Sequence, residues 1–298
     1  MTETNLKEAT RNTYTAGLLA EKKLEILKDD KGNDKAIAGT ITIQTSPVNF
    51  TTYRVYTNKY KKDGNGNETK AYKGLVTIMN EYKSVAEVGK EEADWITTKG
   101  KVQPNSYKGE QGIVELMQFS SSYFSRVAKE KIEDNIVSNF SVEVYIKAIR
   151  PEVVTSGEDA GEPTGRAIID GYLPLYEGNI EPIQLIAPEE DGIAEAVMDT
   201  FNAGETVMFD GEIQNTRVEI VKEIPMAIGK PKIERKIDFK NELIITGASE
   251  SYGEERAYSA EVIQAALAVR EEKLNEEKSG STSTAKKPAA SGRKASWM

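Results

Sequence analysis

Residues 37–56 read IAGTITIQTSPVNFTTYRVY, and this stretch carries the clearest structural signal in the chain. Ile37, Ile41 and Ile43 share one face, and the polar residues that alternate with them share the other, which is the period of a half-buried β-strand. After a turn, a second strand is predicted from Phe50 to Tyr60, with core residues on one side and rings and cations on the other. The stretch therefore predicts two adjacent strands that cover a core with one face.

The flanking segments extend this pair to a five-strand pattern. A strand is expected from Tyr14 to Leu27, followed by a tight turn at 29–34. Apolar residues from Leu75 to Ala86 recur at helical spacing, and two more strands are expected at 95–102 and 113–124, around a turn segment at 103–112. Three strands, a helix and two strands are the order of the OB-fold, a five-stranded barrel whose strand 2 and 3 face and loops bind oligonucleotides.

The second half of the chain echoes this order and adds one further strand. Strands are expected at 139–149, 165–175, 180–186, 206–213, 216–222 and 239–246, with a short helix at 192–201. The block Ala203 to Val207 followed by Gly211 resembles residues 93–96 followed by Gly100, which indicates a weak internal duplication. A helix capped by Ser259 then leads into a tail rich in Ser, Thr, Ala and Lys.

The predicted fold class is mainly β, with tandem OB-fold-like barrels. The expected divisions are an N-terminal OB-fold at 1–136, a second and acidic OB-like domain at 137–250, a C-terminal helix at 251–278 and a disordered tail at 279–298.

Composition excludes several classes of protein. The 298 residues include no Cys and no His, which removes thiol nucleophiles, imidazole bases and Cys/His zinc sites. The stretch MTETNLKEAT lacks the basic patch and apolar segment typical of a secretory signal, and no apolar run reaches the roughly 18 to 20 residues that a membrane span needs. We therefore expect an intracellular protein without a membrane partner. Acidic runs such as Glu189 to Asp191 suit helix termini and linkers, and no P-loop or calcium-loop spacing occurs. We expect no enzyme activity, no cofactor and no metal.

The net charge of −9 is unevenly distributed. Residues 36–130 carry 13 basic and 10 acidic side chains, whereas residues 131–270 carry 13 basic and 27 acidic ones. Because affinity for phosphates depends on the local field, the first half suits an anionic ligand and the second half does not. We therefore expect the acidic half to contribute little direct contact with phosphates.

Aromatic rings interleaved with cations gather in the first half. Unpaired bases stack on such rings, and Lys and Arg neutralise phosphates without reading sequence, so the pattern favours single-stranded nucleic acid. The alternative is that the tyrosines are ordinary strand formers and the lysines a solvated rim. The expected nucleic-acid-binding residues are Arg54, Tyr56, Lys59, Tyr60, Lys61, Lys62, Tyr72, Lys73, Lys99, Lys101, Tyr107 and Lys108.

Four stretches resemble recurring blocks in a family of single-stranded DNA-binding proteins from phages and prophages of Gram-positive bacteria: YKGLVTIMNEYK at 72–83, SYFSRV at 122–127, AGETV at 203–207 and LIITGASE at 243–250. The resemblance implies a protein that coats and protects single strands, without sequence specificity, during phage DNA replication or recombination in the host cytoplasm. It also implies replication or recombination proteins as partners and leaves homo-oligomer formation open. The chain ends GRKASWM, unlike the acidic tip by which bacterial single-stranded DNA-binding proteins recruit partners.

Two other classes remain open from the sequence. The first is a structural or assembly protein of a virion that makes protein contacts only. The second is a nuclease that uses carboxylate-bound Mg²⁺, since hydrolysis at such a site needs neither Cys nor His.

Overall fold

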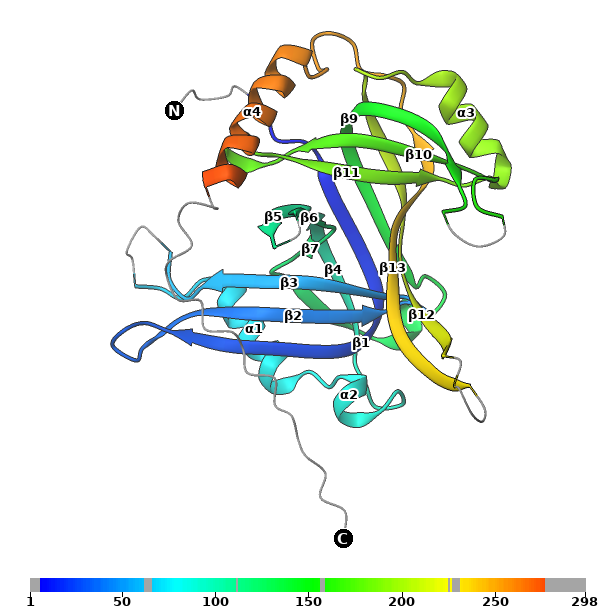
Figure 1. Cartoon of the computed structure of the whole chain (residues 1–298). Helices are drawn as coiled ribbons and strands as arrows, with labels where there is room; N and C mark the ends of the chain where they lie inside the picture. The colour runs from blue at the N-terminus through cyan, green and yellow to red at the C-terminus, as the bar shows by residue number, and fades with distance from the viewer. Residues whose placement is uncertain are drawn as a thin grey trace.

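The computed structural model describes residues 6–61, 66–110, 112–155, 159–224, 226 and 231–276. Among them, 11 strands form one sheet that closes on itself twice, and two more strands form a separate hairpin. The two closed parts lie one above the other in Figure 1, with helices at their outer ends. The predicted mainly β class is confirmed. No helix of the described residues is long and apolar enough to cross a membrane.

The first barrel has OB-fold topology. β1 pairs with both β2 and β4, β2 pairs with β3, and the parallel pairing of β3 with β7 closes the ring through β4. The helices α1 and α2 lie between β3 and β4, as this fold requires. Its elements are β1 (Arg11–Lys28), β2 (Asp34–Gln44), β3 (Phe50–Asn58), α1 (Lys70–Glu81), α2 (Val85–Val88), β4 (Trp95–Val102), β5 (Asn105–Gly109), β6 (Gly112–Leu116), β7 (Phe119–Ser120) and β8 (Phe124–Val127).

The second barrel repeats this topology strand for strand. β9 pairs with both β10 and β12, β10 pairs with β11, and the parallel pairing of β11 with β13 closes the ring. The helix α3 again lies between the third and fourth strands, and α4 packs outside on β11 and β5. Its elements are η1 (Lys129–Lys131), β9 (Val137–Val153), β10 (Pro163–Pro174), η2 (Tyr176–Gly178), β11 (Ile180–Ala187), η3 (Glu190–Gly192), α3 (Ile193–Thr200), β12 (Thr206–Ile224), β13 (Lys232–Ala248) and α4 (Ala260–Glu276).

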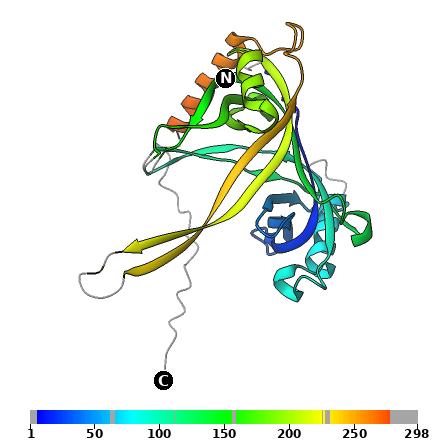
Figure 2. The same cartoon turned by 90° about the vertical axis from the view of Figure 1, so that its right-hand side faces the viewer.

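The two barrels are joined by a strand ladder and by two hairpins, one from each barrel, that contact the other barrel. β1 and β9 pair antiparallel, so β4, β1, β9 and β12 form one continuous surface. The β5–β6 hairpin reaches the second barrel, where Ser106 Oγ donates to Glu181 at 2.6 Å. The long hairpin of β12 and β13 projects outward (Figure 2), and its base binds the first barrel, where Asn49 Nδ2 donates to Ile213 O at 3.1 Å. The proposed domain limits at 136 and 250 stay a prediction.

The alternating pattern of the opening stretch produces the core. Ile37, Ile41 and Ile43 are fully buried, and each contributes roughly 1.5–3 kcal/mol by leaving water. Tyr53 is also fully buried, and its hydroxyl makes hydrogen bonds with Thr15 Oγ1 at 2.7 Å and Thr13 Oγ1 at 3.1 Å. These bonds satisfy the one polar atom of a large core ring. The residues on the other face of β3 are consequently presented outward.

Several predicted elements differ from the structure. The expected turn at 103–112 contains β5, and the expected strand at 113–124 is broken into β6, β7 and the start of β8. The single helix expected from Leu75 to Ala86 is two, α1 and α2. The strands expected at 206–213 and 216–222 form one strand, because Gln214 and Asn215 pair with Glu242 and Asn241 instead of turning. The predicted tail at 279–298 lies outside the described residues.

Candidate nucleic-acid interface

A hollow of about 760 Å³ on the outside of the first barrel brings together four of the predicted residues, Arg54 and Tyr56 from β3 and Lys99 and Lys101 from β4. We call it the cationic groove. Strand register explains why these residues meet although they are far apart in sequence. One row of paired residues crosses five strands, and all of its members line the groove: Thr40, Arg54, Ser120, Lys101 and Asn12.

Two exposed tyrosine rings line the cationic groove. The side chain of Tyr56 is 57% exposed and that of Tyr123 is 65% exposed. Ser121 holds the loop that carries Tyr123, because its hydroxyl donates to Lys99 O at 2.9 Å and accepts from the Tyr123 amide at 3.3 Å. Tyr123 was not among the predicted binding residues, although it stands in the SYFSRV block. Both rings offer a face on which a base can stack.

The cations of the groove differ in how freely they can bind an anion. The side chains of Arg54 and Lys99 have no hydrogen-bond or ion-pair partner among the described residues. Lys101 Nζ donates to Glu8 Oε1 at 3.0 Å, and this hydrogen bond is the main reason that the pKa of Glu8 lies below its usual value. Within the described ranges, the groove therefore carries two cations without a partner and one that is shared with a carboxylate.

A second group of predicted residues lies at the end of β3 and the start of α1. The ammonium of Lys59 is 3.6 Å from a carboxylate oxygen of both Asp34 and Glu68, and 5.6 Å from the ring centroids of Tyr60 and Tyr72. Desolvation opposes the charge of Lys59, but these rings and carboxylates raise its pKa overall. Tyr72 is only 3% exposed. Lys59 and Tyr72 therefore already have partners within the protein.

The remaining predicted residues are placed apart from the cationic groove. Lys61 and Lys73 are exposed, near the second group, and Lys62 lies outside the described residues. Tyr107 and Lys108 are on β5, where Lys108 Nζ donates to Asn275 Oδ1 of α4 at 3.0 Å. This hairpin packs against the second barrel, so the structure separates its ring and cation from those of β3 and β4.

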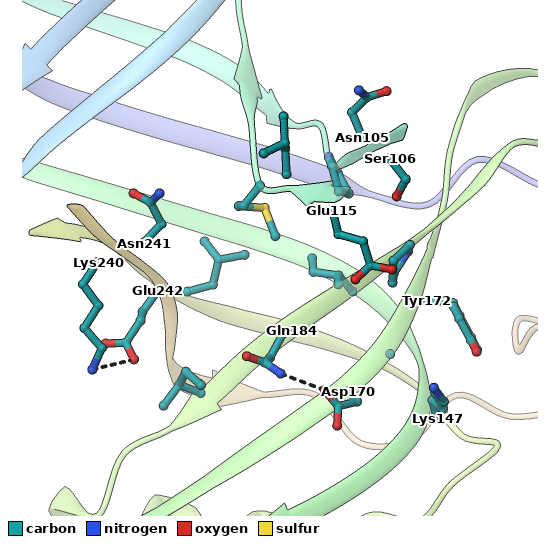
Figure 3. A pocket seen from close by; sticks show the side chains of 18 of the residues that line it. Asn105, Ser106, Glu115, Lys147, Asp170, Tyr172, Gln184, Lys240, Asn241 and Glu242 are labelled. Atoms are coloured by element: carbon teal, nitrogen blue, oxygen red, sulfur yellow. Dashed lines mark hydrogen bonds and ion pairs between the residues drawn. The ribbon is translucent and has the colours of Figure 1, made fainter. Parts of the chain in front are cut away.

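The corresponding face of the second barrel is lined differently (Figure 3). A hollow of about 510 Å³ lies between the β5–β6 hairpin and the strands β10, β11 and β13, which correspond to β2, β3 and β7. Its carboxylates are paired: Asp170 accepts from Gln184 at 2.9 Å and from Arg150 at 3.0 Å. Burial acts to raise the pKa of Glu242, but hydrogen bonds from Arg166 and Lys240 lower this pKa overall. No group of acidic side chains in the described ranges is arranged to hold a metal ion.

These observations define a β-rich protein of two OB-fold barrels, with a groove of cations and rings on one of them. The chain belongs to the YorF family, whose model matches residues 11–280. A comparison with curated proteins finds no match.

Two solved structures of the single-stranded DNA-binding protein from Thermus aquaticus are among those that the chain is similar to. The wild-type protein has 10% sequence identity and a TM-score of 0.46, and the match covers 85% of this chain and 98% of that one. A deletion mutant has 9% identity and a TM-score of 0.47, with 83% and 97% covered.

Proposed function

We propose that the protein binds single-stranded DNA without sequence specificity and that the cationic groove holds the strand. The observation that carries this proposal is the meeting of three cations and two exposed rings in one hollow. Arg and Lys attract a phosphate backbone of any sequence, and every base has a face that can stack on tyrosine. No part of this arrangement needs the groove of a duplex.

In the proposed complex, Arg54, Lys99 and Lys101 neutralise phosphates while Tyr56 and Tyr123 stack bases. The row from Thr40 to Asn12 crosses five strands, so the backbone of the DNA follows the curved outer face of the first barrel. Lys61 and Lys73 extend the positive surface beyond the groove. Binding is stoichiometric, and the protein protects the strand without any turnover.

We also propose a biological role for this binding. The protein coats single strands during phage DNA replication or recombination in the cytoplasm of a bacterial host, where replication or recombination proteins are further partners. The four sequence blocks that resemble those of phage single-stranded DNA-binding proteins support this role.

A salt titration of binding to a fluorescent dT oligomer tests the proposal. Each neutralised phosphate lowers log K by about 0.7 per unit of log salt, so three groove cations predict a slope of about −2. We expect much weaker binding to a duplex of the same length. Equal affinity for both would contradict the proposal, no binding to either would favour a virion protein, and Mg²⁺-dependent loss of the oligomer would favour a nuclease.

A further inference from the structure

The surface between the two barrels is built from rows of paired residues whose charge changes sign. Across β4, β1, β9 and β12, strand register gives one row of Lys99, Tyr14, Asn139 and Glu212, and a second of Lys101, Asn12, Ser141 and Asp210. Paired residues project from the same face of a sheet, and so do residues two apart on one strand. All eight side chains therefore lie on one face, with cations at one edge and carboxylates at the other.

The two edges occupy equivalent places in the two barrels. Between the charged positions lie Gly100 on β4 and Gly211 on β12, each on the fourth strand of its barrel. A Cβ at Gly100 would lie 2.6 Å from the Ser120 carbonyl of the fifth strand, and a Cβ at Gly211 would lie 2.1 Å from the Ile244 carbonyl of the equivalent strand. Because Gly100 and Gly211 make the same backbone contact, they hold equivalent positions in the two barrels. By this equivalence, Lys99 corresponds to Asp210 and Lys101 corresponds to Glu212.

The cationic groove continues into this surface. A second hollow of about 590 Å³ shares Asn12, Lys99 and Gly100 with the groove and extends to Asp210 and Glu212. Tyr14, which is 39% exposed, lies between the two edges. Neither carboxylate has a hydrogen-bond or ion-pair partner among the described residues. The two hollows therefore form one continuous surface, whose charge changes from positive at Lys99 to negative at Asp210 and Glu212.

We propose that Asp210 and Glu212 form the electrostatic end of the DNA site, so that the strand passes Lys99 and stops near Tyr14 instead of crossing onto the second barrel. This inference rests on the proposed function and adds the determinant of the site's length. Three strand spacings of about 4.8 Å separate the backbone of each acidic residue from that of the lysine in its row by about 14 Å along the sheet. Because screening at physiological salt acts over about 8 Å, the two carboxylates repel the phosphates next to them and leave those at Arg54 unaffected.

The test is charge reversal at this edge in the full-length chain. We expect Asp210→Lys with Glu212→Lys to lengthen the stretch of poly(dT) that each protein covers, measured by titrating the protein's own fluorescence. The slope of log K on log salt should steepen by about 1.4, since two phosphates gain a cation at about 0.7 each. Asp210→Asn with Glu212→Gln keeps the shape of both side chains and should lengthen the site by a smaller amount.

The matched control is Glu195→Lys with Asp199→Lys on α3, which makes the same change in net charge at exposed positions outside both hollows. We expect this control to leave the covered length unchanged. Equal lengthening in the control would overturn the inference, because net charge alone would then set the site. An unchanged length and slope in both edge variants would also overturn it. If the unmodified chain fails to bind dT, the proposed function fails and the inference fails with it.

Discussion

The two barrels share one topology and differ in what covers the same face. On the first barrel, the hollow over β2, β3 and β7 exposes Arg54, Tyr56 and Tyr123 to solvent. On the second, the hollow over β10, β11 and β13 lies under the β5–β6 hairpin, and carboxylates such as Asp170 and Glu242 are bound by cations of the same barrel. The shared fold therefore does not determine what each barrel binds, because the side chains at corresponding positions determine what each face attracts.

The fourth strands of the two barrels, β4 and β12, also share their backbone packing and differ in their surface charge. Gly100 and Gly211 meet the same requirement, a close approach to the carbonyl of the fifth strand. Their neighbours are lysines in one barrel and acidic residues in the other. Backbone packing and surface charge are thus set independently, and the two can be separated by substitution.

Removing the cations of the first barrel should have the largest effect on binding. We expect Arg54→Glu, Lys99→Glu and Lys101→Glu together to weaken dT binding more than about 100-fold and to bring the salt slope of about −2 close to zero. The control reverses the charges of Lys23, Lys83 and Lys129, which are at least 58% exposed and lie outside the groove. A similar loss in the control would show that net charge, not the groove, distinguishes the barrels.

Removing the rings should have the next largest effect. Tyr56→Ala and Tyr123→Ala should each weaken binding by about 1–3 kcal/mol, since each ring stacks one base, and Phe at either position should keep most of the affinity. Tyr176 on the second barrel is 64% exposed and serves as the matched control. Fluorescence anisotropy with a dT oligomer measures all of these variants. A loss for Tyr176→Ala as large as for Tyr123→Ala would place stacking on both barrels.

Substitution of the equivalent glycines Gly100 and Gly211 should lower the stability of the fold. Gly211→Ala and Gly100→Ala should lower the free energy of unfolding by about 1–3 kcal/mol, with the larger loss at Gly211, whose Cβ would come closer to a carbonyl. Thermal unfolding followed by circular dichroism measures this loss. Gly247→Ala on β13 is the control, because a Cβ there would have no atom within 4 Å. An equal loss of unfolding free energy at all three positions would contradict the equivalence of Gly100 and Gly211.

Lys59 should give the smallest change in DNA affinity. Its ion pairs with Asp34 and Glu68 already use its charge. Lys59→Ala should therefore change dT affinity by less than Lys99→Ala, because the side chain of Lys99 has no ion-pair partner in the described part of the chain. Lys59→Ala should lower the free energy of unfolding only slightly, as expected for partly exposed ion pairs. If Lys59→Ala weakens binding as much as Lys99→Ala, the DNA path includes the end of β3.

Local pattern predicted much of the fold. Alternation at Ile37, Ile41 and Ile43 identified β2, and helical spacing from Leu75 identified α1, because each depends on the period of a single element. The same logic failed at Gln214 and Asn215. Two polar residues in sequence look like a turn, and only their partners on β13 keep the strand continuous.

The sequence by itself determined the mainly β class, the absence of Cys and His chemistry, and the uneven division of charge between the halves. These are properties of composition and local period, and they do not depend on what packs against what. Only the tertiary structure decided that Arg54 and Lys101 share a groove with Tyr123, whereas Lys59 is engaged by Asp34 and Glu68 and Lys108 is bound to α4. The physical reason is strand register, which brings residues distant in the chain onto one face and cannot be read from the spacing of residues within any single strand.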